Sequence, residues 1–244
     1  MRGVSPRIRR RFYPDDRRDG TTQFYERLRD DLHGRPVVLN LGAGPGDAPG
    51  SEWFPIRDMR APGRTIHGCD PDPDVLHNAQ VDESRVMEDG AIPYGDAFFD
   101  AVFSDYVFEH VDDTQRFLRE IRRVLKPGGV LHFRTPNTFH YVGLAARALP
   151  HGIHTLVANR ARRLPADAHD PYPTFYRLNT PRAIRRQFRE AGFQSVELKM
   201  VETQPFYLVF NTLAFLGGVA YERVVNRFDA LSGLRANIFG RAIR

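Results

Sequence analysis

Short apolar runs alternate along the chain with stretches whose apolar residues follow a helical spacing. The run at 37–41 ends in glycines and predicts a buried parallel strand, and further strands are predicted at 65–70, 99–104, 130–134, 195–201 and 237–242. Phe117, Ile121 and Val124 give helical spacing to 112–126, and Thr180 and Pro181 open a second predicted helix over 180–191. Because strands and helices alternate, we expect βαβ units and a largely parallel sheet.

The length of 244 residues suits one α/β domain with a full core. We expect a basic N-terminal arm and helix over 1–35, followed by the main domain over 36–244. Within that domain, the connection over 137–179 is long and rich in aromatic and basic residues, which favours a cap over the substrate. A second feature is an apolar helical segment over 206–227.

Charge and cysteine content bear on which partners, cross-links and metal sites the protein can have. The net charge is +5, and arginine supplies nearly all of the positive charge, most densely at 7–18. This cluster fits either a solvated arm or a contact with an anionic partner. The single cysteine excludes an intrachain disulfide, the histidines lack metal-ligand spacing, and we expect no metal. A cytoplasmic location is the default expectation, because no secretory signal is evident.

A glycine-rich turn follows the first predicted strand. Gly42, Gly44 and Gly46 lack side chains, so the backbone here is able to press against a flat, extended ligand. A nicotinamide-dinucleotide site would call for glycine at position 47, where Asp47 would repel a pyrophosphate. A nicotinamide oxidoreductase is therefore a disfavoured alternative, and a plain tight turn is another.

An acidic residue ends the second predicted strand, 28 positions after Gly42. The carboxylate of Asp70 is placed to accept hydrogen bonds from both hydroxyls of a ribose. Alternatively, Asp70 is a turn residue without a ligand, as an aspartate before a proline often is.

Five segments in this order resemble the class I S-adenosylmethionine (SAM)-dependent methyltransferases, in particular the group of ubiquinone- and menaquinone-biosynthesis enzymes and small-molecule methyltransferases. The segments lie within 37–136 and are the glycine loop, Asp70, Ile92-Pro93 with Phe98-Phe99-Asp100, Phe108-Glu109-His110, and Leu125-Lys126-Pro127-Gly128-Gly129. The resemblance implies an α/β, Rossmann-like methyltransferase fold. It would have a mostly parallel seven-stranded sheet, helices on both faces and a cap insertion. SAM would be the cofactor.

The resemblance also implies roles for individual residues. Four positions of the loop would cradle the methionine end of SAM: Gly42, Ala43, Gly44 and Gly46. Asp70 would bind the ribose and Pro71 would lie against the adenine. Asp89 and Gly90 would lie near the adenine amine, with Glu88 competing for that place. Ser104 and Asp105 would flank the sulfonium. Asn40 departs from the pattern, since the family usually has an acid there.

Transfer of a methyl group from a sulfonium is an in-line displacement that depends mainly on alignment. An acceptor oxygen or nitrogen (carbon is the weaker expectation) can also require a general base. The candidates are His110 and His140, each of which has a purely structural alternative. We expect a small acceptor, hydrophobic or glycan- or lipid-like. Alternatives are a non-catalytic SAM-binding protein and a nucleic-acid methyltransferase, although the chain lacks an Asn/Asp-Pro-Pro-Tyr/Phe stretch and nucleic acid is the weaker partner.

Residues 206–221 form the most apolar stretch of the sequence. Its 16 residues fall short of the roughly 20 that a membrane-spanning helix needs. Apolar residues occur all round a helical wheel drawn for it, unlike in an ordinary surface helix. Three interpretations remain, namely a buried segment, a homodimer interface, and peripheral contact with a membrane or lipid-like acceptor, which would make the cytoplasmic protein membrane-associated.

Overall fold

The computed structural model describes residues 3–14, 19–148 and 172–244. The chain divides into two compact units. The sheet unit comprises Thr22–Thr135, Thr174–Lys199 and Phe239–Arg244. The helical unit comprises Met1–Thr21, Pro136–Pro173 and Met200–Ile238. The domain limits expected from the sequence stay predictions.

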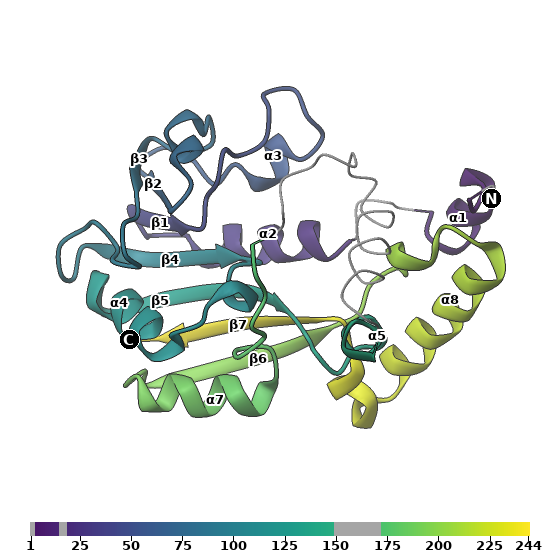
Figure 1. The fold of residues 1–244 in the computed structure, drawn as a ribbon. Coiled ribbons are helices and arrows are strands. Elements are labelled where there is room, and N and C mark those ends of the chain that lie inside the picture. Colours follow the sequence, from purple (N-terminus) through teal and green to yellow (C-terminus); the bar gives the residue numbers. More distant parts are fainter. Residues whose placement is uncertain (1–2, 15–18, 149–171) are drawn as a thin grey trace. The chain divides into compact units, whose positions relative to one another are not determined.

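A seven-stranded sheet runs in the order β3-β2-β1-β4-β5-β7-β6 (Figure 1). The strands are β1 Val37–Leu41, β2 Thr65–Asp70, β3 Glu83–Val86, β4 Phe99–Asp105, β5 Leu125–Pro136, β6 Ser195–Val201 and β7 Asn237–Ile243. The pairs from β3 through β5 are parallel. The end of β7 meets the start of both neighbours, since Arg244 N donates to Gly129 O and Gln194 N donates to Ile243 O. β7 is therefore antiparallel, and the predicted fold class is confirmed.

The helices of the sheet unit are α2 Gly20–Asp31, α3 Phe54–Arg57, α4 Thr114–Val124 and α7 Pro181–Glu190, with short 3-10 helices η1 Pro73–His77 and η2 Phe108–His110. The helices predicted over 112–126 and 180–191 are present as α4 and α7, and Asp113 and Thr180 cap them by accepting from Arg116 N and Ala183 N. The stretch 42–64 forms only α3, as its prolines and glycines predict. The Lys-Pro-Gly-Gly stretch belongs to β5, which starts directly after α4.

Side chains of β5 alternate between the two faces of the sheet. On one face, the Phe133 ring stacks on Phe108 with centroids 4.5 Å apart and lies 5.2 Å from Phe188 of α7. Gly240 of β7 leaves room for this ring, because a Cβ there would lie 2.0 Å from Phe133. On the other face, α2 packs through Phe24 against β7 and through Tyr25 against β4. Helices thus cover both faces.

The helical unit holds α1 Pro6–Phe12, α5 Tyr141–Ala148 and α8 Thr212–Arg227, with the 3-10 helices η3 Phe206–Leu208 and η4 Asp229–Leu234. Within the described ranges, none of the helices has the length and apolar character to cross a membrane. The expected cap over 137–179 falls partly outside the described residues, since the structure describes only 137–148 and 172–179 of it.

Candidate functional site

The glycine loop lies where the strand order reverses between β1 and β4, the usual ligand position in such sheets. Gly42, Gly44 and Gly46 all have positive φ, of 79°, 50° and 70°. A Cβ on Gly42 would lie 2.1 Å from Val107 Cγ2, so this position accepts only glycine. A Cβ on Gly44 would meet nothing within 4 Å among the described residues, which leave that side of the loop open.

Two buried amide side chains hold the loop in place. Asn78 Nδ2 donates to Ala43 O at 3.0 Å and to Gly44 O at 3.1 Å. Gln80 Oε1 accepts from Asp47 N at 2.8 Å. Gly46 is required beside Asn78, because a Cβ there would lie 2.3 Å from Asn78 Oδ1. Neither Asn78 nor Gln80 follows from the sequence, since an isolated amide in a loop carries no periodic signal.

Asp70 is brought to the glycine loop by the pairing of β2 with β1. Its Oδ2 accepts from Gly44 N and its Oδ1 accepts from Asp72 N, each at 2.9 Å. Burial raises the pKa of this carboxyl, against the lowering effect of the two backbone hydrogen bonds. Each oxygen has a further lone pair, so both could accept from ribose hydroxyls.

The segment predicted to lie near the adenine follows β3. Met87 N donates to Asp70 O at 2.8 Å, which brings the turn 88–91 to the end of β2. Asp89 and Gly90 have φ of 48° and 70° and are exposed, as are Pro71 and Glu88. Their contacts with adenine stay predictions, and nothing in the geometry separates Asp89 from Glu88.

Ser104 and Asp105 end β4 beside the loop. Ser104 is fully buried, and its hydroxyl has no hydrogen-bond partner among the described residues. Asp105 binds the guanidinium of the buried Arg134 through both oxygens, at 2.6 and 2.7 Å. The parallel register sets Asp105 opposite Arg134 on β5. Its charge is therefore already matched, and its predicted place beside a sulfonium is untested.

Glu109 lies next to His110 in η2, and no pattern in the sequence predicts a role for it. Its carboxylate is buried and accepts from Thr135 Oγ1 at 3.2 Å, while Asn179 Nδ2 donates to the same hydroxyl oxygen at 2.7 Å. Burial raises the pKa of Glu109 to about 7. The sequence offers no signal for this burial, since Asn179 lies 70 residues further along.

The two histidines predicted as bases lie in different units. His110 ends η2 in the sheet unit and is half-buried. His140 belongs to the helical unit, where its Nε2 lies 3.3 Å from Glu202 Oε2 and its ring contacts Tyr141. Burial and Glu202 raise the pKa of Tyr141. These contacts give His140 a structural explanation within its own unit, and a catalytic role for either histidine stays a prediction.

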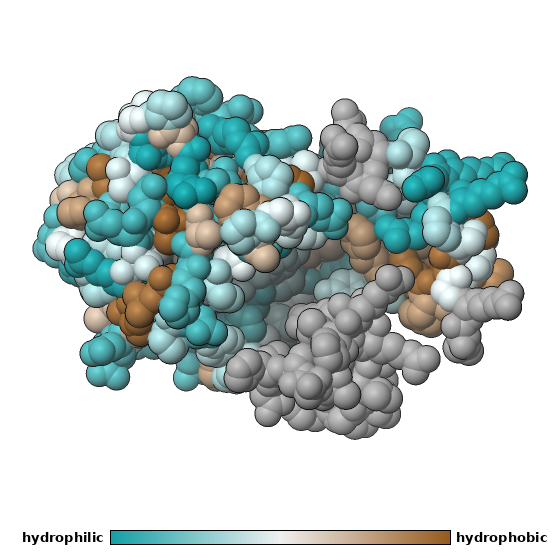
Figure 2. Space-filling model, turned by 90° about the horizontal axis from the view of Figure 1, so that it is seen from above, coloured by the Kyte–Doolittle hydropathy of each residue, from teal (hydrophilic) through white to brown (hydrophobic). Residues whose placement is uncertain are grey.

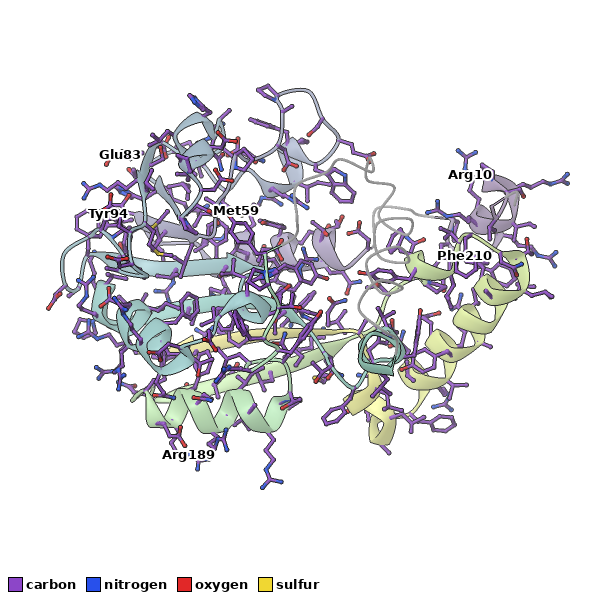
Figure 3. All side chains as sticks on the ribbon, in the orientation of Figure 1. Arg10, Met59, Glu83, Tyr94, Arg189 and Phe210 are labelled. Atoms are coloured by element: carbon purple, nitrogen blue, oxygen red, sulfur yellow. The ribbon has the colours of Figure 1, made fainter. Side chains whose placement is uncertain are left out.

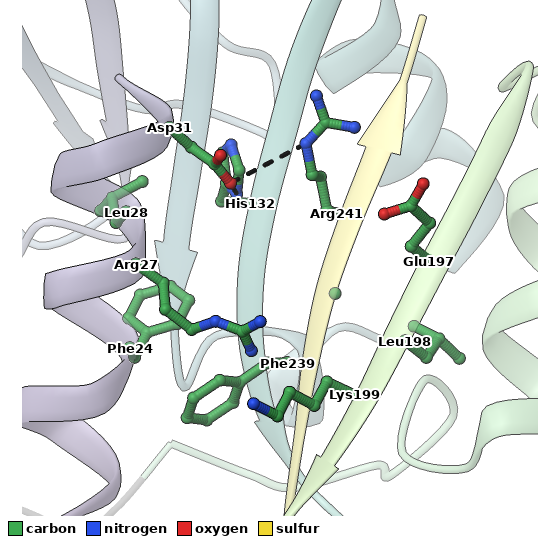
Figure 4. Close-up of a pocket in the computed structure, with 11 residues that line it drawn as sticks. Phe24, Arg27, Leu28, Asp31, His132, Glu197, Leu198, Lys199, Phe239 and Arg241 are labelled. Carbon is green, nitrogen blue, oxygen red and sulfur yellow. Dashed lines mark ion pairs between the residues drawn. The ribbon is translucent and has the colours of Figure 1, made fainter. Parts of the chain in front are cut away.

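A separate cavity opens on the face of the sheet that α2 covers (Figure 4). It lies between α2 and strands β5, β7 and β6, with Asp31, His132 and Arg241 in its lining. Burial lowers the pKa of His132 to about 4, although Asp31, 3.6 Å away, acts in the opposite direction. None of the predicted site residues lines this cavity. Across the described residues, no three acidic, histidine or cysteine side chains form a metal-binding group.

Comparison with known proteins agrees with this geometry. Residues 39–133 match the family model described as a methyltransferase domain. An uncharacterized methyltransferase of Mycobacterium sp. (strain KMS) is 32% identical over 127 residues, which are 49% of this chain and 48% of that protein. A demethylmenaquinone methyltransferase of Tropheryma whipplei (strain Twist) is also 32% identical, over 42% of this chain and 44% of that protein. The chain thus spans about half the length of the curated relatives it matches.

The fold agrees over a longer stretch than the sequence does. A solved SAM-dependent methyltransferase of Thermotoga maritima, described as a possible histamine N-methyltransferase, aligns with a TM-score of 0.56 at 15% identity. The alignment covers 97% of this chain and 95% of that one, and at this identity it supports the fold alone. Residues 39–133 thus match a methyltransferase domain, and the fold over nearly the whole chain is that of a solved SAM-dependent methyltransferase.

Proposed function

We propose that the whole chain transfers a methyl group from SAM to an oxygen or nitrogen atom of a small acceptor. The observation that carries this proposal is the hydrogen bond from Gly44 N to Asp70. It joins the open glycine loop to a carboxylate that retains acceptor capacity. This pairing suits an adenosine whose extended tail carries no phosphate, which describes SAM, whereas Asp47 would repel a pyrophosphate.

The residues would share the work as follows. The backbone of Gly42–Gly46 would hold the methionine end, and Asp70 would hold the ribose. The cofactor supplies a methyl group already activated on a sulfonium, so the protein's main contribution is alignment. The proton of the acceptor must still leave, and a nearby base would take it.

Glu109 is a candidate for this base alongside His110. It is buried just after the end of β4, and hydrogen bonds from Thr135 and Asn179 fix the network around it. A carboxyl whose pKa is about 7 is half ionised near neutral pH, the range in which proton transfer is efficient. If Glu109 takes the proton, wild-type turnover should rise with pH through about 7, and Glu109→Gln should lower it about 100-fold or more.

The burial of Glu109 also predicts a change in stability that can be measured without an acceptor. A glutamate in an unfolded chain has a pKa of about 4.3. Because the folded pKa is higher, at about 7, Glu109 stabilises the fold at low pH and loses that contribution as pH rises through about 7. The loss amounts to roughly 4 kcal/mol. Relative to wild type, Glu109→Gln should gain stability in urea unfolding between about pH 5 and pH 8.

The matched control for this prediction is Glu26→Gln, which changes an exposed glutamate in the same unit. It should keep the wild-type pH dependence of unfolding. Equal pH dependence in wild type and Glu109→Gln would show that Glu109 is ionised at no cost to the fold, and would remove it as the proposed base.

The acceptor class is the finer part of the proposal. Supporting observations are the match to a methyltransferase domain and the apolar character of 206–221, which suits a hydrophobic or lipid-like acceptor. The test is incubation with methyl-labelled SAM and fractionated cell extract, followed by mass spectrometry of the labelled product. A labelled small molecule is expected. Label that nuclease treatment releases would favour the nucleic-acid alternative, and SAM binding with no labelled product would favour a non-catalytic role.

A further inference from the structure

We propose that the helical unit docks on the surface of an anionic lipid bilayer. The docking surface consists of a basic part on α1 and an apolar part on and before α8. Its basic residues are Arg7, Arg10 and Arg11, and its apolar residues are Phe206, Tyr207, Phe210, Leu213, Leu216 and Val224. This inference goes beyond methyl transfer and does not depend on the identity of the acceptor.

The two parts are fixed to each other. Tyr13 Oη donates to Glu222 Oε2 at 3.1 Å, and Phe12 packs edge-on against Phe215 with ring centroids 6.2 Å apart. At the other end of α1, Val4 N donates to Val209 O at 2.8 Å. Segments about 200 residues apart in the sequence therefore form one surface, which the sequence alone does not reveal.

The apolar part is exposed although the helix behind it is well packed. One face of α8 is buried through Phe215, Gly218, Val219, Glu222 and Val225. The other face leaves Leu213 79% exposed and Phe210, just before the helix, 48% exposed. The exposed positions 213, 216, 220 and 224 recur at intervals of three and four, which places them on one side of the helix. In Figure 2, a patch of hydrophobic residues (brown) lies beside hydrophilic residues (teal) on the surface of the helical unit.

Charge identifies the partner. Arg7, Arg10 and Arg11 are exposed on α1, and the α1 sequence contains no acidic residue. The one acid of α8, Glu222, is buried and bonded to Tyr13 and Asn226. Arg10 and Phe210 are marked in Figure 3. Exposed arginines beside exposed apolar rings and leucines match a bilayer interface, in which anionic head groups border acyl chains.

A second copy of the chain fits this surface less well. A twofold interface would bring the same patch of both copies together, and the arginines of each α1 would then face like charges. An anionic bilayer instead supplies opposite charge to the arginines and apolar depth to the side chains around Phe210 and Leu213. Because α8 has 16 residues, it would lie in the plane of the interface rather than cross it.

The test is flotation of the full chain with vesicles of phosphatidylcholine, either alone or mixed with phosphatidylglycerol. Wild type should float with the anionic vesicles at low salt and stay behind with phosphatidylcholine alone. Near an anionic surface each arginine contributes about a fivefold gain in partitioning. Arg7→Glu/Arg10→Glu/Arg11→Glu should therefore lower partitioning at least about 100-fold. Phe210→Ser/Leu213→Ser should abolish the binding that persists at high salt.

Matched controls test whether the loss of flotation is specific to the docking surface or follows from changing any exposed arginines or any exposed apolar side chain. Arg182, Arg185 and Arg189 are exposed on α7, where Figure 3 marks Arg189, and their triple change to glutamate should leave flotation unchanged. Leu76→Ser should do the same, since Leu76 is 56% exposed in the sheet unit. Circular dichroism checks that every variant is folded. The proposal is overturned if wild type does not float, or if the control variants lose flotation as much as the docking-surface variants do. It is also overturned if sedimentation shows a dimer that dissociates in Phe210→Ser/Leu213→Ser.

Discussion

Gly44→Val is expected to abolish SAM binding while leaving the protein folded. Gly44 has a φ of 50° and lies at the centre of the loop, and a Cβ there would have no atom of a described residue within 4 Å. No described residue would clash with the Cβ of the valine, although the positive φ strains its backbone, and the new atoms occupy the space that the ligand needs. Isothermal titration with SAM should give no binding heat for this variant.

A matched variant removes the ambiguity of backbone strain. Gly63 also has a positive φ, of 74°, and a Cβ there would likewise meet no described residue within 4 Å. Gly63→Val carries a comparable backbone penalty but lies in the turn before β2, away from the glycine loop. It should bind SAM as wild type does. If Gly44→Val also binds SAM normally, or if both variants lose binding together, the loop is not the cofactor site.

Asp70→Ala should weaken SAM binding by about 2–4 kcal/mol, or roughly 30- to 1000-fold, through the loss of hydrogen bonds to a carboxylate. The variant loses the acceptor for Gly44 N as well as the proposed ribose contacts. Asp70→Asn separates these effects, because an amide oxygen can still accept from one backbone amide while its NH₂ group cannot accept from a ribose hydroxyl. Both variants should therefore lose affinity, and Asn should retain more of the unfolding midpoint than Ala.

Asp72→Asn serves as the control for this series. Asp72 follows two positions later, and its side chain caps η1 by accepting from Asp74 N. Its substitution should leave SAM affinity within a few-fold of wild type. Unchanged SAM affinity in Asp70→Ala would contradict the assignment of Asp70 to the ribose.

The parts of the fold that the sequence predicts well are those with a strong local signal. The predicted limits of β1 and β2 are the observed ones, because these strands are largely buried and bounded by turn residues, and the limits of β6 also agree. The pattern predicts no strand at β3, because its four residues alternate between exposed and half-buried and lack an apolar run. It also places the start of β5 too late, since Lys-Pro-Gly-Gly is typical of a helix stop although the strand begins directly at Leu125.

In the candidate site too, some residues can be predicted from the local sequence, whereas others depend on contacts with distant parts of the chain. Gly42, Asp70 and Ser104 can be placed from sequence because they lie at the ends of parallel strands whose carboxyl ends share one edge. Asn78, Glu109 and Arg134 acquire their surroundings only from pairing across the fold. A fully buried arginine is understood only once the register puts Asp105 opposite it.

In the helical unit, the sequence pattern alone does not determine which residues are covered. A helical wheel of 206–221 shows apolar residues on all sides and cannot tell which face is buried. That face is set by α1, which lies about 200 residues earlier in the chain and is followed by Tyr13; Phe12 and Tyr13 both pack against Phe215. The interpretation of the segment as simply buried is therefore too coarse, because one side of α8 is buried and the other is exposed.

The most direct test of the account is titration of the wild-type protein with SAM, S-adenosylhomocysteine and NAD under the same conditions. The glycine loop, the open side of Gly44 and the carboxylate of Asp70 predict saturable binding of both sulfur-containing nucleosides at a single site in the chain. Asp47 beside the loop predicts no binding of NAD. Binding of NAD without binding of SAM or S-adenosylhomocysteine would contradict the account.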